Sequence, residues 1–475
     1  MSSKSVIVIG GGLAGLSSAV ALADAGFRVR LLEQKPFLGG RASSYALPTG
    51  EVVDNCQHVT LGCCANLEDF YRRIGAAGKI TWYDRLVFVD REGRRSTMEA
   101  SPLPAPLHLT PSLLLFSSLS WHDRRSIADG MLAIIRRGGK NLHGDAMGKS
   151  MLDWLHLHHQ SPAAIARFWG VVLVSALNEE LAQIDARYGL DVFWKAFIAN
   201  RRGYLLGIPN VPLSKLYEGC GPEIDSRGGE VALRTTVRGL CVMDGRVAAV
   251  ETDNQPGQTA DYYVLAVPHQ AVPELLPAEV LDREPIFGNL QRLRLSPITS
   301  VHFWFDRDVM AEPFLALMDR TAQWIFNKSR LCGGTGPRMG EGRYLQLVIS
   351  ASYDLVSRSR KEILDLCLQE LHEVLPEARE ANLANATVIK ETAATFSPEV
   401  GSGRWRPLQR TPISNLFLAG DWTATGWPAT MEGAVRSGYL AAEAVLAAAG
   451  EPRKFLQPDL AVEGLTKYFA ERPGP

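Results

Sequence analysis

Three glycines and an acid near the N-terminus have the spacing of a dinucleotide-binding site. Gly10, Gly12 and Gly15 follow the apolar run at 6–9, and Glu33 comes 23 residues after Gly10. The first glycine permits a tight turn, the second lets the backbone approach a pyrophosphate, and the third lets a helix lie close to a strand. A carboxylate at the position of Glu33 accepts hydrogen bonds from a ribose hydroxyl and would repel a 2′-phosphate. The segment therefore predicts a dinucleotide cofactor other than NADP.

Two later segments could contact the same cofactor. Gly40 and Arg41 belong to a Gly-Gly-Arg turn in which the guanidinium could neutralise a diphosphate, although a solvated surface arginine is the alternative. Gly420 and Asp421 end an apolar run, and Asp421 could bind the ribityl chain of a flavin or simply cap a helix. A helix predicted from Met431 would direct unpaired N–H groups and a positive dipole end at the N1/C2 edge of a flavin ring.

The first motif needs a strand, a helix and a second strand to position it. The residues at 6–9 predict the first strand, the apolar run after Gly15 predicts the helix, and 28–33 predict the second strand. Three successive glycines at 10–12 would break the apolar helix of a signal peptide, so this segment is not interpreted as one. Further on, Asn66 is expected to cap the next helix.

The order of predicted elements indicates a nucleotide domain assembled from three separate pieces. Short strands with turns occur at 228–267, and an apolar strand at 416–420 precedes a helix at 432–448. The segment from about 103 to 206 lacks β-α-β rhythm and is mostly helical. We therefore predict an α/β protein with a discontinuous Rossmann-type cofactor domain, an α+β substrate domain and a C-terminal tail. Their ranges are 1–100, 215–285 and 390–450 for the first, 101–214 and 286–389 for the second, and 451–475 for the tail.

Composition limits the partners of the chain. Its 475 residues are 46% hydrophobic and carry a formal net charge of −1, which gives no overall attraction to nucleic acid. The seven cysteines contain no Cys-x-x-Cys pair, so thiols in a reducing cytosol are expected rather than disulfides or zinc. His156, His158 and His159 cluster without a carboxylate or cysteine at ligand spacing, and we predict no metal site. No segment has the roughly 18 continuous apolar residues of a membrane span.

Over nearly its whole length the sequence resembles the flavin amine oxidase and carotenoid desaturase superfamily. The resemblance rests on the glycine motif with Glu33, the turn ending at Arg41, the pair Gly420-Asp421 and the run Met-Glu-Gly-Ala at 431–434. It implies an amine oxidase or phytoene desaturase-like fold and FAD as the cofactor. It also implies that backbone groups at Val237 meet the adenine and those at Met431 meet the flavin ring.

Four further segments are similar to the hydroxysqualene dehydroxylase family, the squalene-associated flavoenzymes of bacterial hopanoid pathways. They are Val-Asp-Asn-Cys-Gln-His-Val at 53–59, Leu-Pro-Ala-Pro-Leu at 103–107, Ser-Ala-Leu-Asn-Glu at 175–179 and Ala-Gly-Asp-Trp-Thr-Ala-Thr-Gly-Trp-Pro-Ala-Thr-Met at 419–431. Cys56 departs from the glycine expected at its position.

This second resemblance implies reductive removal of an allylic hydroxyl from a C30 isoprenoid, hydroxysqualene, to give squalene. Protonation lets the hydroxyl leave as water, and reduced flavin supplies hydride to the delocalised allylic cation. Asp54 and His58 are the candidate acid and its partner, and Asn178 is a weaker candidate for orienting the hydroxyl. A structural hydrogen bond and a buried core histidine are the alternative roles of the first two. Trp427 is expected to shape the cavity beside the flavin.

Other activities stay open at this point. Amine oxidases carry an aromatic wall for the amine at the position of Thr430, so this residue counts against amine oxidation. Desaturation of phytoene or a related polyene uses the same kind of cavity with hydride flow in the opposite direction, and the sequence does not fix that direction. A flavoprotein that only binds polyprenoids is a third alternative. The sequence contains no second dinucleotide unit, so electrons are expected from an external donor or a flavin reductase.

So apolar a substrate resides in a bilayer, and we expect a cytoplasmic protein with a lipid-facing entry. Leu-Leu-Leu-Phe at 113–116 is apolar, and the helix after it has Ile127, Met131, Ile134 and Ile135 on one face. Around that face lie Arg124, Arg125, Arg136, Arg137 and Lys140. Such a helix could dock peripherally on anionic lipids at the inner face of the cell membrane. An ordinary core-facing helix with solvated basic residues fits the pattern equally well.

Overall fold

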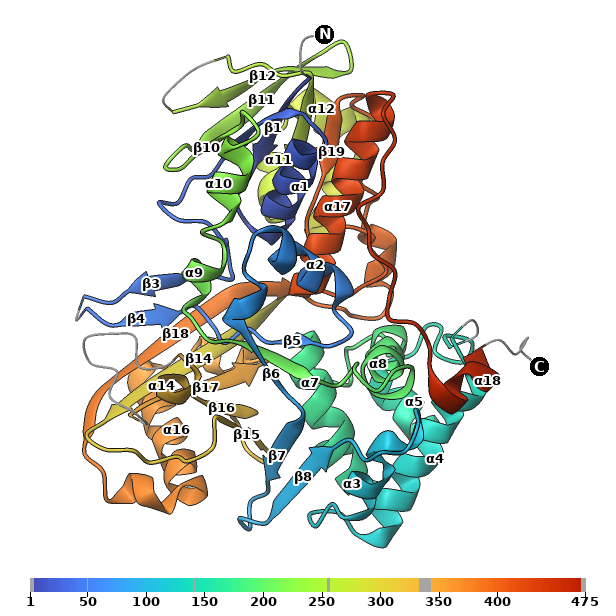
Figure 1. The fold of residues 1–475 in the computed structure, drawn as a ribbon, viewed down its shortest axis with the longest axis vertical. Coiled ribbons are helices and arrows are strands. Elements are labelled where there is room, and N and C mark those ends of the chain that lie inside the picture. The colour runs from blue at the N-terminus through green and yellow to red at the C-terminus, as the bar shows by residue number, and fades with distance from the viewer. Residues whose placement is uncertain (1–3, 49, 140–141, 254–256, 333–342, 471–475) are drawn as a thin grey trace.

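The computed structural model describes residues 4–470, apart from 49, 140–141, 254–256 and 333–342. Figure 1 shows two parts stacked along the long axis of the molecule, an upper part built on a parallel sheet and a lower part built on a larger mixed sheet with helices beside it. Lys140, one of the basic residues named above, lies outside the described residues.

A five-stranded parallel sheet forms the centre of the upper part. In spatial order its strands are β10 (Glu230–Ala232), β2 (Arg28–Leu32), β1 (Ser5–Ile9), β13 (Tyr262–Leu265) and β19 (Leu416–Leu418). The two strands predicted from the first motif are β1 and β2, and three distant segments complete the sheet. The prediction of a nucleotide domain assembled from separate pieces agrees with this strand order.

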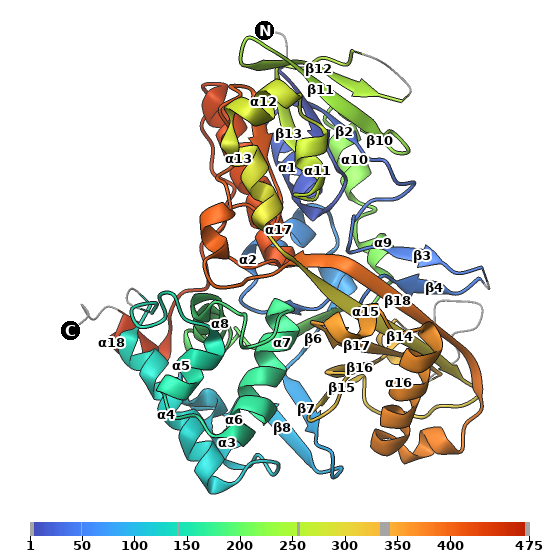
Figure 2. The ribbon, with the colours of Figure 1, turned by 180° about the vertical axis from the view of Figure 1, so that it is seen from behind.

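Alternate residues of β1 face two different layers, which explains why the strand is a continuous apolar run. Val6 and Val8 pack with α1 (Leu13–Asp24), α10 (Cys220–Asp225) and α17 (Met431–Ala448). Ile7 and Ile9 face the opposite layer, which Figure 2 shows from behind. That layer consists of the hairpin β11 (Val237–Met243) and β12 (Arg246–Thr252) and the short helices α11 (Ala271–Glu274), α12 (Ala278–Arg283) and α13 (Pro285–Gly288).

The two long helices of the first layer cross at very short distance. A Cβ on Gly438 would lie 2.1 Å from Ser17 Oγ and 2.3 Å from the carbonyl oxygen of Ala14. Glycine is therefore required at the crossing, where the middle of α17 packs against the first turns of α1.

A seven-stranded sheet forms the centre of the lower part. Its order is β18 (Leu383–Phe396), β14 (Leu295–Phe305), β17 (Tyr344–Ser350), β16 (Trp324–Asn327), β15 (Phe314–Leu317), β7 (Arg85–Val89) and β8 (Arg95–Glu99). Val301 and Phe303 of β14 pack against α16 (Arg360–Val374) on one face. Our boundary at residue 100 was wrong in one respect, because β7 and β8 pair with this sheet and not with the parallel one.

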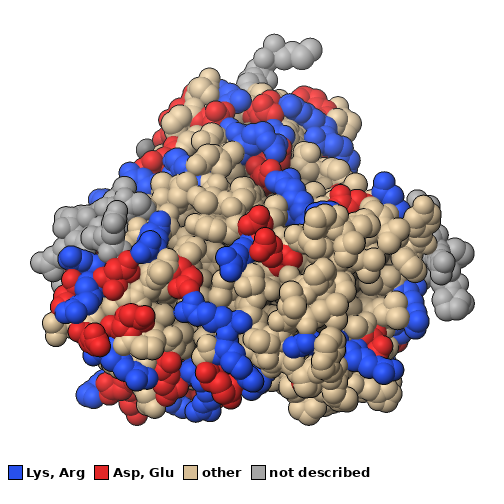
Figure 3. Space-filling model, turned by 60° about the horizontal axis from the view of Figure 1, so that its bottom comes forward, with Lys and Arg blue, Asp and Glu red and all other residues tan. Residues whose placement is uncertain are grey.

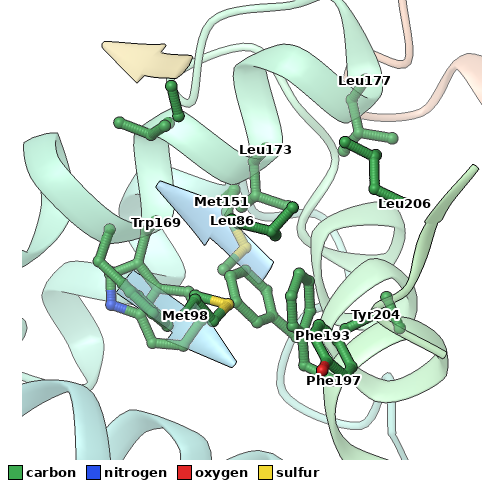
Figure 4. Close-up of a cluster of buried hydrophobic side chains, with 14 of the residues drawn as sticks. Leu86, Met98, Met151, Trp169, Leu173, Leu177, Phe193, Phe197, Tyr204 and Leu206 are labelled. Carbon is green, nitrogen blue, oxygen red and sulfur yellow. The ribbon is translucent and has the colours of Figure 1, made fainter. Parts of the chain in front are cut away.

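Helices fill the segment that was predicted to be mostly helical. They are α3 (Thr110–Leu114), α4 (Trp121–Arg137), α5 (Met151–Leu157), α6 (Pro162–Ala164), α7 (Val171–Leu177) and α8 (Ala186–Val192). Figure 4 shows how their core meets the edge of the large sheet: Trp169, Leu173 and Phe193 pack near Leu86 and Met98 of β7 and β8.

Short elements join the two parts. They are the hairpin β3 (Ser44–Ala46) and β4 (Val52–Asp54), the sheet of β5 (Thr60–Leu61), β9 (Leu206–Pro209) and β6 (Ile80–Tyr83), and the helices α2 (Ala65–Arg73) and α9 (Leu213–Leu216). Two further short helices, α14 (Lys328–Leu331) and α15 (Tyr353–Val356), pack on strands of the large sheet. The predicted tail also joins the two parts, because Phe455 is buried against the upper part and α18 (Lys467–Ala470) packs on α4 of the lower part.

Candidate active site

The glycine motif forms the turn that its spacing predicts. Gly10 has φ +106°, and a Cβ there would lie 2.5 Å from the carbonyl oxygen of Ala266. A Cβ on Gly15 would lie 1.9 Å from the carbonyl oxygen of Gly10. By contrast, a Cβ on Gly12 would make only an ordinary van der Waals contact, with Gly40 Cα at 3.9 Å. Gly10 and Gly15 are thus required by the protein itself, whereas Gly12 leaves room for a ligand.

Glu33 is fixed at the end of β2 and is 6% exposed. Its Oε2 accepts a hydrogen bond from the N–H of Gly11 at 2.7 Å, and its Oε1 accepts one from the N–H of Lys35 at 2.7 Å. Each carboxylate oxygen keeps a second lone pair, which a ribose hydroxyl can use. The N–H of Thr235 bonds the carbonyl of Glu33, and β11 begins two residues later at Val237. The proposed contact of Val237 with adenine stays a prediction.

The Gly-Gly-Arg turn lies directly against the glycine motif and against the C-terminal motif. Gly40 has φ +62°, and a Cβ on it would lie 3.0 Å from Gly12 Cα. Arg41 donates from Nη2 to Asp421 Oδ1 at 2.7 Å and from Nη1 to the carbonyl of Ala394 in β18. The preceding residue Gly420 donates its N–H to Ser437 in α17. Three motifs from the two ends of the chain therefore form one site.

The N-terminus of α17 faces the same region. Thr430 caps the helix, since its Oγ1 accepts from the N–H of Gly433 at 3.0 Å. In the described part of the chain the N–H groups of Met431 and Glu432 have no hydrogen-bond acceptor. These donors and the helix dipole favour negative charge near this end of the helix.

Glu432 performs a task that we had assigned to Asn66. Its carboxylate accepts from the N–H groups of Asn66 and Leu67, at the N-terminus of α2, and from the side-chain amide of Asn66. Asn66 lies within α2, and the side chain of the cap residue Cys64 makes no capping hydrogen bond. The prediction that Asn66 caps this helix was wrong because an acid from a distant helix supplies the acceptor. Burial raises the pKa of Glu432 above its ordinary value, although these N–H groups oppose that change.

An apolar cavity of about 230 Å³ begins at this helix end and runs along the inner face of the large sheet. Its wall includes Thr430, Met431 and Trp427 from the C-terminal motif. Farther along, the wall consists mainly of apolar side chains, among them Val59, Leu86, Met98, Phe197, Leu206 and Trp324. Figure 4 shows several of these side chains converging from strands and helices. The cavity suits a hydrocarbon chain rather than a polar metabolite.

Asp54 lies behind this wall in a buried ion pair that sequence reasoning did not foresee. Lys328, the first residue of α14, donates from Nζ to Asp54 Oδ2 at 2.7 Å, and both side chains are 3% exposed. Asp54 Oδ1 accepts from Ser44 Oγ at 2.6 Å and from the N–H of Leu213 at 3.1 Å. Burial raises the pKa of Asp54, but the Lys328 ammonium and these hydrogen bonds lower it more, so it lies below its ordinary value. An ionised, fully bonded carboxylate is poorly suited to donate a proton.

In the described part of the chain His58 forms no hydrogen bond or ion pair with Asp54. Its Nδ1 lies 3.0 Å from the carbonyl oxygen of Cys56, which can only accept, so Nδ1 carries the hydrogen and Nε2 the lone pair in the neutral ring. Burial lowers the pKa of His58 below its ordinary value. Burial likewise raises the pKa of the Cys56 thiol to about 12, which keeps it protonated. The geometry therefore argues against Asp54 and His58 as an acid and its partner, and a neutral His58 is better suited to accept a proton than to give one.

Asn178 is fully used by the fold. It ends α7 with φ +52°, and its amide donates to the carbonyl of Ser296 and to Thr395 Oγ1. Its Oδ1 accepts from the N–H of Ala351 at 2.8 Å. These bonds connect the end of α7 to β14, to β18 and to the residue after β17. The suggestion that Asn178 orients a substrate hydroxyl is not supported, because its polar atoms already have protein partners.

Lys328 and Gln57 are the site residues that sequence reasoning missed. Gln57 lies in the predicted motif between Asp54 and His58, lines the cavity and accepts from Lys328 Nζ at 2.7 Å. The available signal was a single lysine one residue after the apolar residues Trp-Ile-Phe at 324–326. That pattern does not reveal the partner, since Lys328 and Asp54 are 274 residues apart.

A family model for flavin containing amine oxidoreductases matches residues 13–446. The chain belongs to this family. It is an FAD-dependent oxidoreductase, and FAD is its cofactor. Gly12, Glu33, Arg41 and the N-terminus of α17 fit such a group, because they offer room beside the backbone, hydroxyl acceptors, a cation and unpaired N–H donors in one place.

Relatives in this family that span most of the chain are carotenoid desaturases. The chain is 28% identical over 459 residues to 15-cis-phytoene desaturase of Solanum lycopersicum, which covers 93% of this chain and 77% of that protein. It is 27% identical over 481 residues to a probable zeta-carotene desaturase of Synechococcus elongatus, covering 93% and 98%. Our recognition is thus correct for the superfamily, and the comparisons do not establish the dehydroxylase subfamily.

Solved structures show the same fold. An oxidoreductase from Methanosarcina mazei has a TM-score of 0.71 at 18% identity, with 91% of this chain and 98% of that chain covered. A putative protoporphyrinogen oxidase from Exiguobacterium sp. 255-15 has a TM-score of 0.66 at 18% identity, covering 94% and 99%. The predicted α/β fold of the amine oxidase type is therefore confirmed.

Two further observations concern metals and membranes. Among the described residues no three His, Cys, Asp or Glu side chains are placed to hold a metal ion, and His158 of the histidine cluster instead pairs with Asp145 at 2.9 Å. In the same part of the chain, every helix is too short or too polar to cross a bilayer.

Proposed function

We propose that the protein removes the allylic hydroxyl of hydroxysqualene to form squalene, as the resemblance of its motifs to the hydroxysqualene dehydroxylase family implies. The observation that carries the proposal is the position of the motif at 53–59. Gln57 and Val59 of this motif line the apolar cavity, and the cavity also includes the N-terminal end of α17. The segment that resembles the dehydroxylases thus lies where an isoprenoid would meet the flavin.

Bound FAD, once fully reduced, would supply both a hydride equivalent and a proton for such a reaction, so that the hydroxyl leaves as water. The residues of the chain have three tasks: the cavity wall excludes water, Trp427 and Met431 limit the position of the substrate, and polar groups at Gln57 help the hydroxyl leave. His58 Nε2, with its lone pair, suits the uptake of a proton better than its donation. We infer that an external donor or a flavin reductase supplies electrons, because the sequence contains a single dinucleotide motif.

An anaerobic single-turnover experiment tests the proposal. The FAD-loaded protein is reduced chemically and mixed with hydroxysqualene while the flavin absorbance is recorded and the lipid extract is analysed. We expect reoxidation of the flavin together with formation of an equal amount of squalene. Flavin that stays reduced while the substrate is bound would refute dehydroxylation.

Desaturation of a polyene is the second candidate, and the names of the relatives favour it. Phytoene and zeta-carotene desaturases match more than nine-tenths of the chain at 27–28% identity. In that case the oxidised protein mixed with phytoene would lose flavin absorbance and form a more conjugated product. A protein that binds both lipids without any change in the flavin spectrum would instead fit a non-catalytic polyprenoid carrier.

We also propose that the helical layer docks on an anionic bilayer, although not through the face that we predicted. Ile127 and Ile134 of α4 are fully buried in the core, so the core-facing alternative holds for that stripe. The exposed apolar residues lie at the start of α4 and before it: Trp121 is 70% exposed and Leu115 is 79% exposed. Figure 3 shows the bottom of the molecule. Charged side chains are few over its right half, on the side of α3 and α4, and many over its left half.

Charge and position both favour a lipid partner for this surface. Arg124 lies over the Trp121 ring at 4.9 Å, and α4 carries four arginines against one exposed acid. Behind Leu115, the ring of Phe116 packs 5.4 Å from that of Phe88, which lines the cavity. The buried ring of Phe116 thus links this surface to a residue of the cavity wall, and we infer that a lipid substrate enters from the bilayer here.

A further inference from the structure

The inner wall of the apolar cavity contains one amide whose orientation is fixed from behind by charged groups. Gln57 is 8% exposed and lines the cavity. Its Oε1 accepts from Lys328 Nζ at 2.7 Å, and its Nε2 donates to the carbonyl oxygen of His58 at 3.1 Å. An ammonium can only donate and a carbonyl can only accept, so the oxygen and nitrogen of the amide cannot be exchanged.

This arrangement leaves one donor free. An amide nitrogen carries two N–H groups, and in the described part of the chain Nε2 uses one of them, for His58. The second N–H belongs to a residue of the cavity wall, where an unsatisfied donor costs free energy until a ligand supplies an acceptor. A pure hydrocarbon has no acceptor to offer, whereas an alcohol has one.

Several other polar groups of the cavity wall are already engaged by the protein. Ser175 Oγ donates to the carbonyl of Val171 at 2.7 Å and accepts from Trp324 Nε1 at 2.8 Å. Thr430 Oγ1 accepts from the N–H of Gly433, and Glu432 accepts from α2. Lys195 also lines the cavity, but its Nζ lies over the ring of Trp427 at 4.6 Å and 3.5 Å from Asp459. The indole Nε1 of Trp427 also has no acceptor in the described part of the chain, and Gln57 differs from it because a charged partner fixes the orientation of its amide.

The ion pair behind Gln57 explains why the amide keeps this orientation. Lys328 Nζ contacts both Asp54 Oδ2 and Gln57 Oε1, each at 2.7 Å, and all three side chains are buried. Asp54 is held in turn by Ser44 and by the N–H of Leu213. A charged donor that is itself fixed makes the stronger kind of hydrogen bond and disfavours rotation of the amide.

We propose that Gln57 donates a hydrogen bond to an oxygen atom of an otherwise apolar isoprenoid, and that the Asp54–Lys328 ion pair positions Gln57 for this task. This inference rests on the proposed function and deepens it, since it names the residue that distinguishes the hydroxylated substrate from a hydrocarbon of the same length. Gln57 would contact the substrate, whereas Lys328 and Asp54 are positioning residues.

Ligand binding to the FAD-loaded, oxidised protein tests this inference without turnover. Quenching of tryptophan fluorescence reports occupancy, because Trp324 and Trp427 line the cavity. Dissociation constants for hydroxysqualene and squalene are compared in the same detergent. We expect the wild type to prefer the alcohol by roughly two- to twelvefold, the size of one neutral hydrogen bond. In Gln57→Met this preference falls to about onefold while the affinity for squalene is retained.

Two more variants separate recognition from general damage. Gln57→Leu has a similar volume and lacks both polar atoms of the amide, so it also loses the preference even if Gln57→Met folds poorly. Gln160→Met is the matched control, because Gln160 is a buried glutamine with bonds to Ser126 and Trp169 and does not line the cavity. Its ratio of dissociation constants stays at the wild-type value, since loss of stability alone affects both ligands equally.

The role of the ion pair has its own readout. In Lys328→Met combined with Asp54→Asn, the cavity wall is intact but the amide is free to rotate, so the preference for the alcohol falls by at least half. The single variant Lys328→Arg keeps a charged donor for Gln57 and Asp54, so it keeps more of the preference for the alcohol than the double variant does. An unchanged preference in the double variant would limit the inference to Gln57 alone and remove the positioning role.

The outcomes for the inference and for the proposed function are distinguishable. If the wild type performs single turnover and Gln57→Met keeps the full preference for the alcohol, the recognition role of Gln57 is refuted and dehydroxylation stands. If single turnover fails but a Gln57-dependent preference is measured, dehydroxylation is refuted and recognition of a hydroxyl stands. A wild type without preference for the alcohol overturns the inference outright.

Discussion

Arg41 and Asp421 form an ion pair across 380 residues of sequence, with Arg41 Nη2 donating to Asp421 Oδ1 at 2.7 Å. Asp421 is nearly buried, and the second Nη of Arg41 donates to the carbonyl of Ala394 in β18. The pair joins the Gly-Gly-Arg turn to the C-terminal motif beside the glycine motif. It fixes the position of the guanidinium that would neutralise the diphosphate of FAD. Binding of FAD therefore depends on packing of the N-terminal segment that contains Arg41 against the C-terminal segment that contains Asp421.

Removal of this cation should weaken FAD binding. We expect Arg41→Met to raise the FAD dissociation constant by roughly 10- to 150-fold, the equivalent of one hydrogen bond to a charged group. Titration of the apoprotein with FAD, followed by flavin fluorescence, measures the change. Arg238→Met is the control, because Arg238 pairs with Asp253 on the surface of the β11–β12 hairpin. If Arg41→Met and the wild type bind FAD with equal affinity, the Arg41–Asp421 pair stabilises the fold but does not bind the cofactor.

The Asp54–Lys328 ion pair should contribute to the free energy of unfolding, so that loss of one partner costs more than loss of both. Lys328→Met leaves Asp54 ionised and unpaired in the interior, which costs about 3–5 kcal/mol of unfolding free energy. Adding Asp54→Asn removes the charge and still accepts from Ser44 and Leu213, so most of that loss is recovered. Urea unfolding of the wild type, both single variants and the double variant gives the coupling. Strictly additive losses would contradict a direct pair.

His302 predicts a specific acid sensitivity. It lies in the interior of the large sheet, with Nδ1 2.7 Å from the hydroxyl of Tyr344 and Nε2 3.1 Å from Ser300 Oγ. Burial lowers the pKa of His302 from 6.5 to about 3. The charge of Asp54 raises this pKa slightly and that of Lys328 lowers it slightly. Between pH 6.5 and about pH 3 the unfolded chain binds a proton that the folded protein does not, so stability falls as the pH falls, by about 1.4 kcal/mol per pH unit.

The measurement is the unfolding free energy as a function of pH for wild type and His302→Gln. Glutamine does not titrate, so the slope of the variant between pH 6 and pH 4 should be smaller by about one proton. Parallel curves for the two proteins would show that His302 is already charged in the folded state or that the site is open to water.

The apolar surface before α4 predicts a lipid-dependent change in flotation. Leu115→Glu combined with Trp121→Ala should reduce binding to vesicles that contain anionic phospholipid by about tenfold or more, because two exposed apolar side chains leave the interface. Leu408→Glu is the control, as Leu408 is 67% exposed in the upper part of the molecule. Wild-type protein that fails to float with such vesicles would refute the docking surface.

Local chemistry explains which features could be predicted from the sequence. Glycine is required at positions 10 and 15 because the backbone of Ala266 and of Gly10, respectively, leaves no room for a Cβ. These contacts arise within one strand–turn–helix unit, so the two glycines have a fixed spacing in the sequence. Glu33 follows from the same rule, because a strand of known length separates it from the helix. The parallel strands and the dinucleotide site were therefore predictable from spacing, whereas FAD was predicted from the resemblance to the flavin amine oxidase and carotenoid desaturase superfamily.

The tertiary structure decided which polar residues are free to act. Asp54, His58 and Asn178 are chemically capable residues, but Lys328, the carbonyl of Cys56 and the strands around Asn178 engage their polar atoms. Their partners lie up to 274 residues away, and no periodicity or spacing encodes such a meeting. By itself the sequence determined the dinucleotide-binding turn through short-range backbone geometry, and its resemblance to the flavin amine oxidase and carotenoid desaturase superfamily indicated FAD and the fold. Only the folded chain determined that Gln57 reaches the cavity with a free donor, because burial and hydrogen-bond partners are properties of the assembled core.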